Sequence, residues 1–96
     1  MLSVEVRIPT VFRKFTDDHP SLEVEAGTVA DVIRQIDARF PGFKDQVLSA
    51  DGDLHRFVNV YVNDEDARYL DALDTSVVEG DTVSLLPSVA GGSRGR

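Results

Sequence analysis

The chain has 96 residues, a net charge of −7 and no cysteine. This length allows one domain with a single core, and the absence of cysteine excludes disulfides, cysteine-ligated zinc, iron–sulfur clusters and a thiol nucleophile. The acidic charge argues against nucleic acid and anionic membrane surfaces as partners, because both attract Lys and Arg, and favours a partner protein with a basic docking face.

The N-terminal segment predicts a strand rather than a targeting signal. Residues 3–8 alternate polar and apolar side chains, which is the period of a half-buried strand, and Pro9 ends them. Residues 1–6 lack the charged and apolar regions of a signal peptide, and no stretch reaches the about 20 apolar residues that span a bilayer, so we expect a cytoplasmic protein. A loop is expected at 10–20. Residues 21–25 alternate again, which predicts a hairpin with the first strand.

One long helix follows the predicted hairpin. Thr28 is a typical N-cap, and Asp31 three residues later comes close to the pattern of a capping box. Pro41 and Gly42 end the helix, and residues 43–48 are expected to add a short helical turn. Apolar residues recur at helical spacing and form one stripe: Val29, Val32, Ile33, Ile36 and Phe40.

Residues 57–62 form the strongest predicted strand, because they are rich in β-branched and aromatic residues. Since alternate side chains of a strand face opposite ways, one set packs on the core and the other faces solvent or a partner. We expect Val58, Val60 and Val62 to pack under the helix.

The remaining elements complete a fold of mixed type. Residues 63–66 and 74–76 are expected as polar turns on either side of a short strand at 67–70. Residues 82–86 form the last predicted strand, which Pro87 closes. The order β, β, α, β, short β, β predicts an α+β fold of the β-grasp (ubiquitin-like) type, with one main helix packed across a mixed sheet. The last strand is expected to lie parallel to the first, in the centre of the sheet.

The last nine residues differ from the domain before them. Residues 88–96 are small or basic and have no periodicity, so we expect a domain of residues 1–87 and a flexible tail of residues 88–96. The tail contains Gly91 and Gly92. Glycine has no Cβ, so this end is slim enough to enter another protein's active site, and the chain from Pro87 to Gly92 reaches about 20 Å when extended. A frayed terminus without function is the alternative interpretation.

A family resemblance favours the functional interpretation of the diglycine. In residues 79–92 a Gly-Asp turn leads into an apolar strand, a proline, a short tail and Gly-Gly, and this segment resembles the end of the MoaD/ThiS sulfur carriers. The resemblance extends over the whole domain, including residues 4–10 and the helix from Thr28. Residues 54–68 resemble the CysO-type members, which supply sulfur for cysteine synthesis.

The resemblance implies a protein co-substrate rather than an enzyme. An E1-like partner, similar to the ubiquitin-activating enzymes, would use ATP to adenylate the Gly92 carboxylate. Sulfide or a persulfide would then displace AMP and leave a thiocarboxylate on Gly92. Val89, Ala90 and Gly91 would thread the partner's active site, and a cysteine-synthase-like enzyme would accept the sulfur. No cofactor is expected on this chain, which also lacks a Gly-rich phosphate loop.

The four residues after Gly92 depart from the family pattern, because its members commonly end at the second glycine. While Gly92 lies in a peptide bond, it has no carboxylate to activate. Two explanations stay open. Either a protease, by resemblance to extended carriers a metalloprotease, cleaves between Gly92 and Ser93, or Ser93 to Arg96 are a foreign addition.

Other pathways and another class of function stay open as alternatives. Molybdopterin or thiamine synthesis would be a different destination for the sulfur. An isopeptide bond from Gly92 to lysines of target proteins would make the chain a protein modifier, and an inert tail would leave a ubiquitin-like interaction domain. The β-grasp fold supports all of these functions.

Two acidic segments have a functional and a plainer interpretation. Asp64, Glu65 and Asp66 belong to a charged face that is typical of a solvated surface but also fits docking to basic residues of an activating enzyme. The loop 51–55, with two aspartates and a histidine, suggests a ligand loop, but a solvated turn is favoured. With two histidines and no cysteine in the chain, no metal site is expected.

Overall fold

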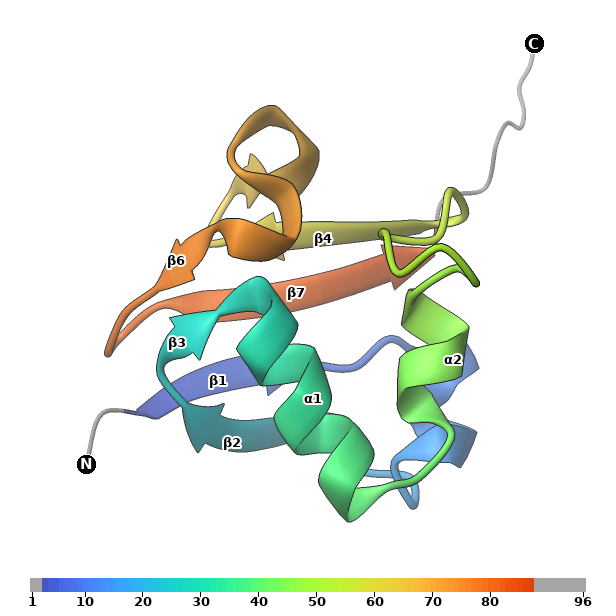
Figure 1. Ribbon diagram of the computed structural model, residues 1–96. Coiled ribbons are helices and arrows are strands. Elements are labelled where there is room, and N and C mark those ends of the chain that lie inside the picture. The colour runs from blue at the N-terminus through green and yellow to red at the C-terminus, as the bar shows by residue number, and fades with distance from the viewer. Residues whose placement is uncertain (1–2, 88–96) are drawn as a thin grey trace, which may run out of the picture.

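Residues 3–87, which the computed structural model describes, form a five-stranded mixed sheet with a long helix, α1, across one face (Figure 1). The strands lie in the order β2–β1–β7–β4–β5, and their bounds are Ser3–Arg7 (β1), Ser21–Glu25 (β2), Val58–Val62 (β4), Glu65–Asp66 (β5) and Thr82–Pro87 (β7). A small antiparallel sheet pairs β3 (Gly27–Thr28) with β6 (Ser76–Val77).

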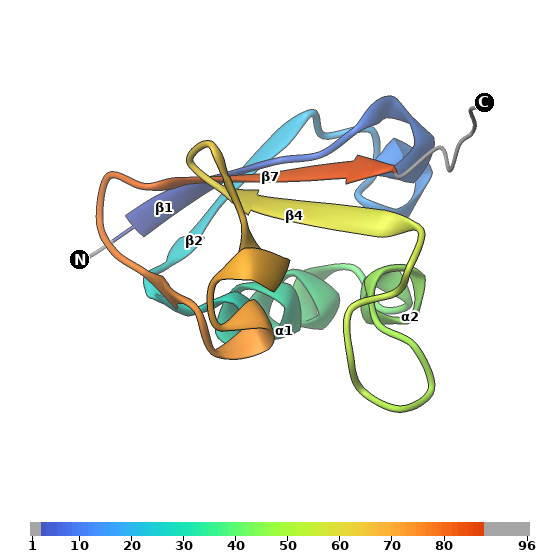
Figure 2. The same cartoon turned by 90° about the horizontal axis from the view of Figure 1, so that it is seen from above.

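The helices α1 (Val29–Arg39) and α2 (Phe43–Val47) lie on the same side of the sheet, as the view from above shows (Figure 2). Short 3₁₀ helices join other elements: η1 (Thr10–Phe15) connects β1 to β2, and η2 (Ala67–Tyr69) and η3 (Ala72–Asp74) lie between β5 and β6. Across residues 3–87, none of the helices is both long enough and apolar enough to cross a membrane.

The strand β7 occupies the centre of the sheet. It pairs with β1 in parallel, with Val83 opposite Val6, and with β4 antiparallel, with Leu85 opposite Val60. On the other edge of β1, β2 pairs antiparallel as a hairpin. The predicted β-grasp arrangement, with a first hairpin and a last strand parallel to the first, is confirmed.

The helix α1 begins at its predicted N-cap. The Thr28 hydroxyl accepts a hydrogen bond from the Asp31 N–H (3.1 Å), and the Asp31 carboxylate accepts one from the Thr28 N–H (3.0 Å), so the capping box is complete. Gly27 leaves room for that carboxylate, because a Cβ at this position would lie 2.8 Å from Asp31 Oδ2. At the other end, Gly42 has a φ of +103°, a conformation that glycine adopts readily, and turns the chain into α2.

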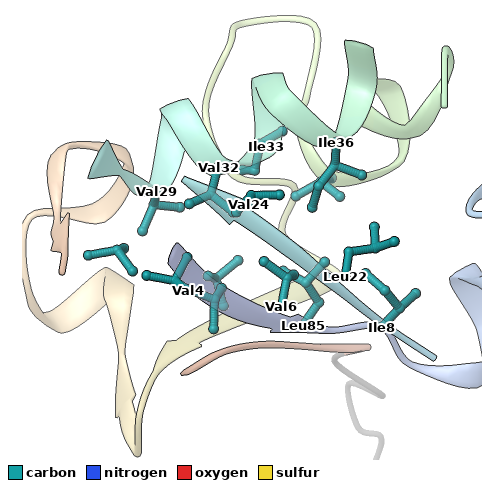
Figure 3. Packing of buried hydrophobic residues seen from close by; sticks show 14 of the residues in the cluster. Val4, Val6, Ile8, Leu22, Val24, Val29, Val32, Ile33, Ile36 and Leu85 are labelled. Atoms are coloured by element: carbon teal, nitrogen blue, oxygen red, sulfur yellow. The ribbon is translucent and has the colours of Figure 1, made fainter. Parts of the chain in front are cut away.

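The apolar stripe of α1 packs on alternate residues of the sheet (Figure 3). Its four helical members are buried, and Phe40, just beyond the helix, packs half-buried against the same core. The predicted inward face of β4, Val58, Val60 and Val62, is confirmed as buried. Each such side chain contributes about 1.5–3 kcal/mol when it is removed from water. The sheet and its flanks add further buried residues: Val4, Val6, Ile8, Leu22, Val24, Val83 and Leu85.

The segment after β1 is helical where a loop was expected. Pro9 provides the carbonyl that accepts the Phe12 N–H (2.9 Å), and the six residues 10–15 form η1. Phe12 and Phe15 pack against the core and hold this connection in place, whereas Val11 is exposed. A 3₁₀ helix of about two turns has no long apolar period that a sequence pattern would reveal.

The prediction of a short strand at 67–70 is wrong. Glu65 and Asp66, which were expected in the turn, pair with β4 instead, and the chain then enters η2. The cause is local, because the Asp66 carboxylate accepts a hydrogen bond from the Arg68 N–H (2.9 Å) and caps the first turn of η2. The two-residue strands β3 and β6 were not expected either, since two residues are too few to show an alternation.

Asn63 and Asp81 tie the turn after β4 to the turn before β7. Asn63 donates its main-chain N–H to the Thr82 carbonyl (2.7 Å), and its side-chain oxygen accepts the Thr82 N–H (3.1 Å). The Asp81 carboxylate accepts hydrogen bonds from the Val78 N–H (2.9 Å) and from the Asn63 amide (3.1 Å). The Val78 bond first, and then the Asn63 bond, lower the pKa of Asp81 below its ordinary value of 3.8.

Replacing Ile33 with Asp should abolish folding. Ile33 is 2% exposed under the centre of α1, and an ionised carboxylate there has no partner, which costs several kcal/mol, about as much as a small domain has to lose. The control is Ala38→Asp, which places the same charge on the exposed face of the same helix. Thermal unfolding followed by circular dichroism checks both variants, and two similar melting curves would contradict the assigned core.

Asp81→Asn should make the fold less sensitive to acid. A carboxylate whose pKa is lower in the folded than in the unfolded chain contributes stability above its unfolded pKa and loses it as the pH falls through the folded value. The free energy of unfolding of the wild type should therefore decrease as the pH falls below about 4, the ordinary pKa of an aspartate. The variant should show a shallower decrease, with Asp31, whose pKa is also lowered, still contributing. Urea unfolding at a series of pH values gives the dependence of the free energy of unfolding on pH for both chains. The same dependence in both would contradict the role of Asp81.

Candidate functional site at the end of the last strand

The residues predicted to carry the chemistry follow directly on the central strand. Val89, Ala90, Gly91, Gly92 and the bond to Ser93 lie outside the described residues, and so does most of the segment expected to be the tail. What the structure describes is the point at which the domain gives way to that segment. Pro87 is the last residue of β7, and it lies opposite Val58, the first residue of β4.

A groove of about 420 Å³ lies beside Pro87, and we call it the exit groove. Segments that are far apart in the sequence meet there, namely η1, α2 and the start of β4, all at the end of the sheet where β7 stops (Figure 1). Its lining is largely apolar with a polar rim: Val11, Phe12, Asp45, Gln46, His55, Phe57, Val58 and Pro87. Sequence reasoning did not identify this groove.

Phe57 is fixed in the wall of the exit groove although its side chain is 52% exposed. The His55 ring centroid lies 5.3 Å from the Phe57 ring centroid, and His55 Nδ1 accepts a hydrogen bond from the Phe57 N–H (3.2 Å). The Arg56 guanidinium lies over the ring, 5.9 Å from its centroid, within the range of a cation–π contact. The segment 55–57 thus holds an exposed aromatic side chain in a defined place.

Arg68 anchors the same segment from the far side. Its guanidinium donates hydrogen bonds to the carbonyls of His55 (2.8 Å) and Val58 (2.7 Å) and to Asn59 Oδ1 (2.6 Å). The Val58 N–H bonds the His55 carbonyl (3.0 Å), so both polar main-chain groups of Val58 are satisfied on the side away from β7. Arg68 therefore covers the part of the β4 edge that the two-residue strand β5 does not reach.

The acidic segment lies at the opposite end of β4 from Pro87. Asp64 and Glu65 are exposed, whereas the Asp66 carboxylate is engaged in capping η2. Along the pair of β4 and β7, Val62 lies opposite Val83 and Val58 lies opposite Pro87, a separation of four residues or about 13 Å. The structure thus does not bring the predicted docking residues next to the start of the tail.

The loop 51–55 is organised by its own hydrogen bonds. The Ser49 N–H donates to the Asp53 carbonyl (2.8 Å) and the Gly52 N–H donates to the Ser49 carbonyl (2.9 Å). Asp51 and Asp53 are exposed, and His55 already uses Nδ1 for the Phe57 N–H. Among residues 3–87, His, Asp and Glu side chains do not gather in any group of three that could hold a metal ion.

Known proteins resemble this chain in sequence and in structure. The sequence profile of the ThiS family matches residues 6–92. The sulfur carrier protein CysO of Mycobacterium tuberculosis is 42% identical over 93 residues, which cover 95% of this chain and 100% of CysO. Small archaeal modifier protein 3 of Haloferax volcanii is 38% identical over 65 residues, which cover 68% of this chain and 70% of the modifier.

A solved structure extends the likeness to the fold. A chain of the Amycolatopsis orientalis BexX/CysO complex superimposes with a TM-score of 0.85 and 45% sequence identity, over 93% of this chain and 99% of that chain. The family match begins at residue 6, inside β1, covers the other strands and both helices, and continues through the diglycine at residue 92. The chain belongs to the ThiS family and is a sulfur carrier protein related to CysO, a carrier rather than an enzyme.

Proposed function

We propose that the chain carries sulfur as a thiocarboxylate on Gly92 and delivers it to cysteine synthesis. The observation that supports this most directly is the ThiS-family match, which runs from the sheet through Gly92. The proposal that the sulfur goes to cysteine synthesis rests on the 42% identity with CysO over 95% of the chain and on the resemblance to carriers that serve cysteine synthesis. Because the activation consumes ATP, we propose the cytoplasm as its compartment.

The proposed chemistry overcomes the low reactivity of a carboxylate. A Gly92 carboxylate oxygen attacks the α-phosphorus of ATP in an E1-like partner, and pyrophosphate leaves. Sulfide then attacks the acyl carbon of the adenylate, AMP leaves with the carboxylate oxygen, and a thiocarboxylate remains. The sulfur atom is now a nucleophile held on a protein, ready for a cysteine-synthase-like acceptor enzyme. ATP belongs to the activating partner in this scheme, not to the carrier.

The architecture suits a carrier made of a domain, residues 1–87, and a tail, residues 88–96. The six residues from Pro87 to Gly92 reach about 20 Å when extended, of which the five residues after Pro87 account for about 17 Å, enough to place Gly92 inside a partner. Val89, Ala90 and Gly91 carry no long or charged side chain, and Gly91 has no Cβ, so this stretch suits a narrow channel. The scheme also requires a free carboxylate, so we propose that a protease, for which a metalloprotease is the candidate, cleaves between Gly92 and Ser93.

A protein modifier is the second candidate function. The 38% identity with a small archaeal modifier protein favours it, and the same Gly92 adenylate would then react with a lysine amine instead of sulfide. The products differ in mass, because a modifier gives adducts on other proteins and a carrier gives a chain in which sulfur replaces one oxygen. Within the carrier function, molybdopterin or thiamine synthesis is the alternative destination.

A chain that ends at Gly92 should accept sulfur, and the chain that ends at Arg96 should not. Activation needs a free carboxylate on Gly92, and in the longer chain the terminal carboxylate belongs to Arg96, a bulky charged residue. Each chain is incubated with the E1-like enzyme, ATP and sulfide, and the intact mass reports the thiocarboxylate. Gly92→Ala in the shorter chain should fold normally but load more slowly, because a Cβ is added at the reacting residue. Equal loading of both wild-type chains without a protease would rule out Gly92 as the working terminus.

We also propose that Asp64 and Glu65 dock the carrier to a basic face of the activating enzyme. The variant Asp64→Lys/Glu65→Lys should bind about tenfold more weakly at low salt and depend less on salt concentration, because exposed charges attract a partner over a Debye length. Asp66 stays unchanged, since its carboxylate caps η2. The control Glu23→Lys/Glu25→Lys makes the same charge change on β2, at the other edge of the sheet. Equal weakening of both variants in a titration would assign the effect to net charge and remove the docking role.

A further inference from the structure

We propose that the exit groove is a recognition site of the carrier, and that it receives an apolar side chain from the mouth of the activating enzyme's channel. This inference rests on the proposed function, because it identifies the surface by which the activating enzyme would recognise a carrier that presents Gly92. It adds a contact that lies neither in the tail nor among the acidic residues Asp64 and Glu65.

The length of the tail decides which surface such a partner must cover. Pro87 itself lines the groove, and Gly92 follows five residues later, within about 17 Å. A protein interface of ordinary size covers about 800 Å² on each partner. A disc of that area has a radius similar to the reach of these five residues. An enzyme that holds Gly92 in its active site therefore lies against the end of the domain where β7 stops, and the exit groove lies inside its footprint.

The chemistry of the groove indicates what it binds. Val11 is 54% exposed and Phe57 is 52% exposed, although both side chains are apolar, and Phe12, Val58 and Pro87 add further apolar surface. A space of about 420 Å³ is large enough for one bulky side chain with its neighbours. Burying such surface contributes about 25 cal/mol per Å², whereas a charged group would lose its hydration against the apolar walls and find polar side chains only at the rim, where Asp45, Gln46 and His55 lie.

The groove is also built before any partner arrives. His55 and Arg56 flank the Phe57 ring, and Arg68 holds the carbonyls on both sides of it. On the other wall, Phe12 and Phe15 fix η1 to the core. Because these walls are already ordered, binding costs little conformational entropy, which is the setting in which an aromatic side chain contributes most to affinity.

The chain supplies a matched control for the test. Val78 is 59% exposed and belongs to the turn between β6 and β7, which lies at the start of β7 (Figure 1). Val11 lines the groove together with Pro87, at the other end of that strand. Val11→Ser and Val78→Ser thus make the same chemical change at almost the same exposure, one in the groove and one far from it. Phe57→Ser removes the aromatic wall. All of these residues are exposed, so the variants should fold, and thermal unfolding verifies this.

The experiment measures the binding of each variant, in the chain ending at Gly92, to the E1-like enzyme by calorimetry without ATP, and then sulfur loading with ATP and sulfide. We expect Phe57→Ser to raise the Kd about tenfold and Val11→Ser to raise it severalfold, while Val78→Ser leaves it unchanged. At saturating carrier, the loading rate of each variant should match that of the wild type, because the groove acts in recognition and not in the chemical steps.

The outcomes separate this inference from the function on which it rests. Equal Kd values for all the variants, or an equal rise in Val11→Ser and Val78→Ser, would overturn the role of the groove. A wild-type chain that binds the enzyme but accepts no sulfur would refute the proposed function, while the Kd values would still decide on the groove. A wild-type chain that does not bind at all would overturn both.

Discussion

The strand β7 is hydrogen-bonded along both edges, to β1 on one side and to β4 on the other, and the rest of the molecule depends on this position. Its inward side chains, Val83 and Leu85, lie in the core beneath α1. The ladder with β1 covers Thr82 to Ser84, and the ladder with β4 continues to the last residue of the strand, Pro87, which lies opposite Val58. The segment that carries the family's diglycine therefore starts from a fixed point of the domain.

The two ends of the β4–β7 pair are secured by different side chains. At one end, Asn63 and Asp81 exchange hydrogen bonds with the backbone and with each other, and the exposed acids Asp64 and Glu65 lie beside them. At the other end, Arg68 donates a hydrogen bond to the Val58 carbonyl on the unpaired edge of β4. The apolar exit groove lies there too, next to the start of the tail. Charge and apolar surface are thus separated by about 13 Å along the same strands, which suits a partner that is attracted at one end and closely packed at the other.

Periodic and local signals in the sequence predicted most of the fold. The alternation around Val60 and the capping pair of Thr28 and Asp31 involve residues that are near one another in the chain, and both predictions are confirmed. The fold order followed from the same patterns, whereas the family came from a resemblance that extends over the whole domain. The missed features depend on distant contacts or on single residues. Arg68, for example, donates a hydrogen bond to the carbonyl of His55, thirteen positions earlier, and no local sequence pattern predicts such a contact. The diglycine stood out by composition, but its functional interpretation needed the family resemblance, because a short glycine-containing tail is also typical of a frayed terminus.

The central claim, that Gly92 becomes the free end on which sulfur is carried, is tested most directly by the intact mass of the chain isolated from cells that produce it naturally. We expect a population that ends at Gly92, part of it with sulfur in place of one carboxylate oxygen. That fraction should increase when the sulfur-accepting enzyme is absent. A chain that keeps Ser93 to Arg96 throughout, with no sulfur-bearing form under either condition, would contradict the claim.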